Sequence, residues 1–125
     1  MAAKKHPVVE ALEKASKGLQ FTSETEAGFE PVLWEGGGQL TKQRLLELAG
    51  AEKGTAVEED TLDRFFRAVP PEDKAKFDRL AKALREQLSD VKVYKVGDEA
   101  EKDVYVVGRT KDGHLAGLKT SVVET

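Results

Sequence analysis

The pattern of apolar and polar residues predicts helices in the first two thirds of the chain. Apolar side chains recur at helical spacing in four segments, so that each segment has one face suited to burial. Thr41 stands where an N-cap is expected, and Gly18 and Gly50 stand where helices commonly end. The predicted helices are 7–17, 42–49, 61–68 and a segment centred on Phe77, Leu80, Ala81, Leu84 and Leu88.

After Asp90 the period of the pattern changes from about 3.6 to 2, which is typical of strands with one buried face. The predicted strands of this region are 91–96, 104–107 and one that begins near Leu115, after the tight-turn pair Asp112-Gly113. Earlier in the chain, 19–22 reads as a short extended segment and 29–35 as a strand. Pro31 lacks an N–H group and therefore favours an edge position. The polar stretch 51–59 carries no predicted element.

These elements predict an α+β fold in which helices pack on a mainly antiparallel sheet. The 125 residues, 39% hydrophobic and 34% charged, suit one compact domain spanning 1–125. No apolar stretch approaches the roughly 20 residues that cross a bilayer, and the first residues lack the apolar core of a secretory signal. We therefore expect a soluble, cytoplasmic protein that is a monomer on its own and does not bind membranes.

Composition argues against several kinds of chemistry. There is no cysteine, hence no disulfide, thiolate nucleophile or cysteine-based zinc site, and we expect no cofactor. The 20 Lys and Arg residues against 23 Asp and Glu residues give a net charge of −3, whereas a protein that neutralises phosphates usually carries a basic excess. Direct binding of nucleic acid is therefore disfavoured.

The sequence also lacks a recognisable catalytic motif. Its two histidines, His6 and His114, lie near the N-terminus and beside the predicted hairpin turn, and neither is paired with a nucleophile by any motif. The serines stand outside any nucleophile elbow, and Gly36-Gly37-Gly38 lacks the spacing of a phosphate-binding loop. We predict a protein that is not an enzyme.

Acidic residues are unevenly distributed. Between Gly18 and Thr41 there is no Lys or Arg, and four glutamates occur there: Glu24, Glu26, Glu30 and Glu35. Two interpretations stay open, namely ordinary solvated acid and a patch that attracts a basic partner. A second acidic group, Asp98, Glu99, Glu101 and Asp103, is expected to be a solvated loop face. The chain end adds oxygen donors suited to Mg²⁺ or its water shell, from Glu124, the Thr125 hydroxyl and the terminal carboxylate.

Two separated blocks of sequence resemble the nuclease A inhibitor family. The first block is Gly18-Leu19-Gln20-Phe21-Thr22-Ser23-Glu24-Thr25-Glu26 followed by Phe29-Glu30-Pro31-Val32-Leu33-Trp34-Glu35-Gly36. The second comprises Val93-Tyr94-Lys95-Val96-Gly97, Asp103-Val104-Tyr105-Val106-Val107-Gly108 and the closing segment 115–125.

This resemblance implies an α-β-α sandwich that inhibits a sugar-non-specific DNA/RNA endonuclease of the ββα-metal type, which cuts with one Mg²⁺ in a basic cleft. It implies that Glu24 and Thr125 reach the nuclease's catalytic metal, its waters or nearby basic groups, so that Thr125 is a metal contact only within the complex. The predicted partner-binding residues are Glu24, Glu26, Glu124 and Thr125. A second interpretation is a non-catalytic interaction or adaptor domain of the same fold without a nuclease target. We assign Phe29 and Trp34 to the core in either case.

Overall fold

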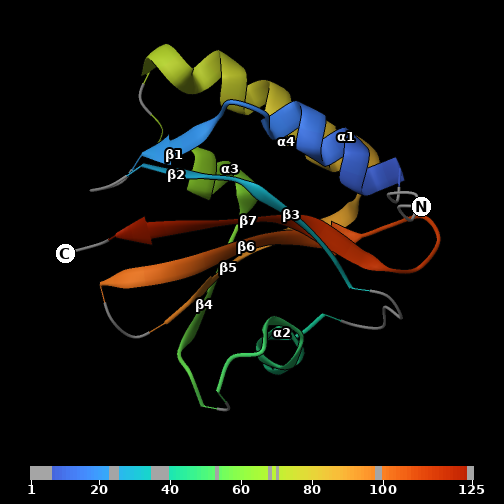
Figure 1. Ribbon diagram of the computed structural model, residues 1–125, viewed down its shortest axis with the longest axis vertical. Helices are drawn as coiled ribbons and strands as arrows, with labels where there is room; N and C mark the ends of the chain where they lie inside the picture. The colour runs from blue at the N-terminus through green and yellow to red at the C-terminus, as the bar shows by residue number, and fades with distance from the viewer. Residues whose placement is uncertain are drawn as a thin grey trace, which may run out of the picture.

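The computed structural model describes residues 7–22, 26–34, 40–52, 54–67, 69, 71–97 and 100–123. Helices lie on both sides of a central sheet, which makes the architecture an α-β-α sandwich of the α+β class (Figure 1). The elements in chain order are α1 (Pro7–Ser16), β1 (Gln20–Thr22), β2 (Glu26–Gly28), β3 (Glu30–Trp34), α2 (Lys42–Ala49), β4 (Val57–Asp60), α3 (Leu62–Phe66), a 3-10 turn η1 (Pro71–Asp73), α4 (Lys74–Gln87), β5 (Ser89–Val96), β6 (Glu101–Arg109) and β7 (Leu115–Val123).

The main sheet has five strands in the order β3-β7-β6-β5-β4, and all neighbours in it are antiparallel. The strand β3 is at one edge, as Pro31 predicted, and β4 is at the other. The hairpin β1–β2 forms a separate two-stranded sheet that contacts β7. The two long antiparallel pairings, β5 with β6 and β6 with β7, are each between strands that are consecutive in the chain.

One face of the sheet is covered by α1, α3 and α4, and α1 and α4 lie side by side over it (Figure 1). Alternate strand residues point to this face because side chains on a strand change sides at every position. The buried cluster includes Leu12 of α1, Phe77, Leu80 and Leu84 of α4, and the strand residues Val93, Val104, Val106 and Leu118.

Among the described helices, α2 is the one that covers the opposite face. Leu45 and Leu46 are buried there against a second cluster of strand residues, Tyr94, Val96, Tyr105, Val107 and Leu115. Both ends of α2 are fixed by residues close to them in the chain. At the N-terminus the Thr41 hydroxyl accepts a hydrogen bond from the Arg44 backbone N–H at 3.1 Å, and at the C-terminus Gly50 ends the helix at φ +72°. These are the bounds that the sequence predicts.

Several sequence-based expectations need correction. The stretch 51–59, expected to carry no element, contains most of β4, and β2 was not predicted at all. Both are short and have few β-forming side chains, so that hydrogen bonds to a neighbouring strand decide their conformation. The helix predicted over 61–68 is shorter, with Thr61 as its N-cap and its last helical residue at Phe66. Ala68 lies outside the described residues.

Candidate functional site

The hairpin β1–β2 and the end of β7 lie at the same end of the molecule (Figure 1). The hairpin pairs Gln20 with Gly28 and Thr22 with Glu26, the last residue of β1 with the first residue of β2. The strand β7 ends at Val123, two residues before the end of the chain. Segments about a hundred residues apart in the sequence are thereby brought to one end of the fold.

The start of β6 lies at this end as well. Glu101 pairs with Val123, and Asp103 pairs with Ser121. The carboxylates of Glu101 and Asp103, expected on a loop, therefore stand on a strand, and both residues are exposed. Since they are two positions apart, they point to the same face of the sheet.

A shallow pocket of about 280 Å³ marks this region. Its lining includes three exposed carboxylate residues, one from the start of β3 and two from β6, and one half-buried lysine from β7. Three carboxylates against one ammonium group make the local charge negative, which suits a cationic surface. The lining residues are Gly28, Glu30, Glu101, Asp103, Lys119, Thr120 and Ser121.

The lysine of this pocket is positioned by the sheet. Glu30 and Tyr105 pair with Lys119 from its two sides, so that all three side chains face the same way. The Lys119 Nζ lies 5.8 Å from the centroid of the Tyr105 ring, a cation–π distance. Burial raises the pKa of Tyr105, and the Lys119 charge acts in the opposite direction. Lys119 is thus held near the sheet, whereas Glu30 stays exposed.

The described residues contain no group of three or more His, Cys, Asp or Glu side chains arranged to hold a metal ion. His114 lies in the β6–β7 turn, as expected, where Gly113 adopts φ +87°. Its Nε2 is 3.8 Å from a carboxylate oxygen of Asp112, and its backbone N–H donates to the Thr110 hydroxyl at 2.9 Å. These contacts of the histidine stabilise the turn.

The sequence profile of the family described as nuclease A inhibitor-like protein matches residues 6–125. The chain belongs to the nuclease A inhibitor-like family. This agrees with the resemblance seen in the two sequence blocks. A search of curated proteins found no significant match. No helix within the described residues is long and apolar enough to cross a membrane.

The predicted partner-binding residues of this nuclease A inhibitor-like protein fall at the edge of what the structure describes. Glu24, Glu124 and Thr125 lie outside the described residues. Glu26 is the first residue of β2, and its side chain is outside the described set. The described residues nearest to them in the chain include Thr22 of β1 and Val123 of β7. We call the end of the fold where the hairpin, the start of β6 and the end of β7 meet the acidic end.

Sequence reasoning did not assign Glu101 and Asp103 to this end of the fold. The signal available was their spacing of two just before the apolar strand 104–107, which fits a strand that begins earlier than its apolar part. Glu30 belonged to the acidic segment already noted. What the sequence could not show is that β3, β6 and β7 place these three carboxylates around one pocket.

The aromatic residues assigned to the core are half-buried. Phe29 packs edge-on against Phe77 with ring centroids 6.0 Å apart, and Trp34 lies 5.8 Å from the Tyr105 ring. Each therefore contributes to one of the two apolar clusters while keeping part of its surface in contact with solvent.

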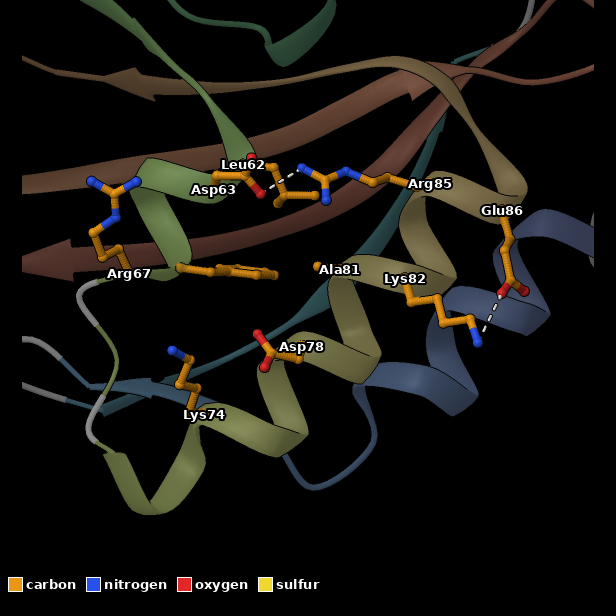
Figure 2. Close-up of a pocket in the computed structure, with 10 residues that line it drawn as sticks. Leu62, Asp63, Arg67, Lys74, Asp78, Ala81, Lys82, Arg85 and Glu86 are labelled. Atoms are coloured by element: carbon orange, nitrogen blue, oxygen red, sulfur yellow. Dashed lines mark hydrogen bonds and ion pairs between the residues drawn. The ribbon is translucent and has the colours of Figure 1, made fainter.

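A larger groove of about 620 Å³ runs between α3 and α4 (Figure 2). Leu62, Phe66 and Ala81 give it an apolar part, and charged side chains of both signs surround it. Arg85 binds Asp63 at 2.6 Å, and Lys82 lies 4.0 Å from Glu86. The lining therefore holds four basic and three acidic side chains, and two ion pairs form among them.

Proposed function

We propose that this chain is a protein inhibitor that binds and blocks the active site of a Mg²⁺-dependent, sugar-non-specific DNA/RNA endonuclease of the ββα-metal type. Membership of the nuclease A inhibitor-like family supports an inhibitory role. The observation that carries the proposal is the acidic end, where the β1–β2 hairpin, the start of β6 and the end of β7 meet.

The chemistry of such a contact follows from what the nuclease binds. A cleft that holds a phosphate backbone is basic, and carboxylates offer the same kind of anionic oxygen acceptors as phosphate groups. In this proposal Glu24 and Glu26 from the hairpin, together with Glu124 and Thr125 from the chain end, enter the cleft. Thr125 supplies a hydroxyl and the terminal carboxylate to the nuclease's own Mg²⁺ or to its bound waters.

The described carboxylates have a supporting part. Glu30, Glu101 and Asp103 are exposed beside the hairpin and the chain end. Exposed charges of this kind accelerate association with an oppositely charged surface, while close contacts determine how slowly the complex dissociates. We assign them to steering and assign Glu24 and Thr125 to the tight contact.

The test is a titration of a purified ββα-metal endonuclease, captured with this protein from the native lysate, with DNA and RNA as substrates. We expect cleavage of both to fall to background at an equimolar ratio, and we expect the chain alone with Mg²⁺ to cleave neither. Unchanged cleavage with the inhibitor in molar excess would refute the proposal. If the captured nuclease binds the chain and still cleaves at its full rate, the adaptor interpretation replaces inhibition.

A further inference from the structure

The strand β4 has an open side. It is the last strand of the main sheet, and among the described strands it pairs with β5 alone. The Gly97 backbone N–H donates to the Ala56 carbonyl at 2.9 Å, and bonding toward a neighbour alternates along an antiparallel strand. Val57 and Glu59 therefore direct their backbone N–H and C=O groups away from β5. In the described part of the chain, no other backbone bonds to them.

The same strand carries three consecutive carboxylates. Asp60 is partly buried and is satisfied locally, since it accepts from the Thr61 backbone N–H at 2.8 Å and lies 3.7 Å from the Arg64 guanidinium. Glu58 and Glu59 are exposed. Because adjacent residues point to opposite faces of a sheet, these two place negative charge on both sides of the open edge.

An apolar pocket adjoins this edge on the α2 side. Its volume is about 470 Å³, and it lies between α2 and the start of β4. Leu46, Ala51 and Val57 provide its apolar surface, with Gly54 and Thr55 beside them. Val57 belongs to both features, since its side chain lines the pocket while its backbone groups face the open edge. Charged side chains alone protect an edge strand from aggregation, so protection against aggregation does not account for the pocket.

We propose that β4 and this pocket bind an extended, basic segment of a partner protein, which adds a strand to the sheet. Unpaired backbone groups provide the affinity of such strand addition, and pockets for alternate side chains provide its specificity. In the bound partner strand, an apolar residue must lie opposite Val57 so that its side chain enters the pocket. The basic residues that follow it then lie opposite Glu58 and Glu59. Charge selects against a second copy of this chain, because pairing β4 with itself would bring carboxylates together.

This surface is separate from the proposed nuclease contact. In the strand order, β5 and β6 lie between β4 and β7, the strand that the hairpin contacts. The start of β4 shares a row of the sheet with Asp103, since Val57 pairs with Val96 and Val96 pairs with Asp103. A partner strand on the outer side of β4 is therefore separated from β7 by β5 and β6.

The experiment uses the full chain and a fluorescein-labelled peptide with the core Lys-Lys-Leu-Lys-Lys, which has the required pattern in both strand directions. We expect saturable binding by fluorescence anisotropy at physiological salt, with amide shifts in NMR spectra strongest at Val57 and Glu59. Replacing the leucine by serine, or methylating the peptide's backbone nitrogens, should weaken binding severalfold. The variant E58K/E59K should weaken it by at least about tenfold.

The matched control is E10K/E13K, which changes the net charge equally at exposed positions of α1, a helix that packs against α4, β3 and β7. It should bind the peptide like the original chain, and thermal unfolding should show that both variants are folded. Equal losses in the two variants would reduce the effect to general charge attraction and overturn the proposal. So would the absence of binding, or a homodimer in sedimentation experiments that protects the β4 amides from hydrogen exchange.

Discussion

Tyr94 on β5 lies directly opposite Glu59 on β4, and its hydroxyl is buried without a hydrogen-bond partner among the described residues. The side chain is 0% exposed. A buried hydroxyl without a partner has lost its bonds to water and gained none in return.

Replacing this tyrosine by phenylalanine should therefore not lower the free energy of unfolding. For Tyr94→Phe we expect a free energy of unfolding in urea that is unchanged or higher by about 1 kcal/mol. A loss of more than about 1 kcal/mol would show that the hydroxyl is bonded in solution, with Glu59 as its acceptor. Tyr105→Phe is a suitable comparison, since that ring lies on the same face.

The same tyrosine predicts a loss of stability at high pH. Burial, with a contribution from Glu59, raises the pKa of Tyr94 from 10.0 to about 12. Between these values the unfolded chain releases the phenolic proton and the folded chain keeps it. Stability is thus fully present below pH 10 and falls as pH rises toward 12, with a slope of up to about 1.4 kcal/mol per pH unit.

Denaturant unfolding at intervals across this range measures the effect. Tyr94→Phe should have a shallower slope than the original chain, and the remainder should come from groups such as Tyr105, whose pKa burial also raises. Identical slopes for both proteins would show that Tyr94 ionises as easily in the folded state as in the unfolded one.

Gly117 should not tolerate a side chain. It is the third residue of β7, where a Cβ atom would collide with the backbone carbonyl of Val106 on β6. Gly117→Ala should lower the free energy of unfolding by about 1–3 kcal/mol or more, because the two strands must move apart. Gly28→Ala is the matched control, since its Cβ meets nothing within 4 Å. If the two variants have equal melting temperatures, the close approach of β6 and β7 is wrong.

Glu24→Gln tests the hairpin's proposed contact with the nuclease. Loss of one charge from a desolvated pair costs on the order of 2–5 kcal/mol of binding, whereas a rim contact costs far less. We expect a large rise in the inhibition constant with an unchanged melting temperature. Glu10→Gln, an exposed carboxylate on α1, should leave inhibition as it was. Equal inhibition by the two variants would exclude a direct role for Glu24.

Deleting Thr125 tests the chain end. The deletion removes its hydroxyl and moves the terminal carboxylate to Glu124, beyond the last residue of β7. Residues past the last packed position contribute little to folding, so the melting temperature should hardly change while inhibition weakens. A C-terminal tag should have the same effect, and an N-terminal tag should have none. Tight inhibition by the truncated and C-tagged forms would show that the chain end stays outside the active site.

The helices and the last hairpin were determined by the sequence alone, because their signals are local. The caps of α2 are side-chain and backbone interactions within a few residues, and the Asp112-Gly113 turn fixes how β6 joins β7. Amphipathic spacing likewise identifies which face of α4 is buried. Such features depend little on what the rest of the chain does.

The strands β2 and β4, and the place where the carboxylates meet, were decided only by the tertiary structure. Val57-Glu58-Glu59-Asp60 becomes a strand because β5 supplies its hydrogen bonds, and its own composition does not favour one. Glu30, Glu101 and Asp103 surround one pocket because the strand order places β3, β7 and β6 side by side. Strand order depends on pairing between distant segments, and hydrophobic periodicity carries no information about which segments pair.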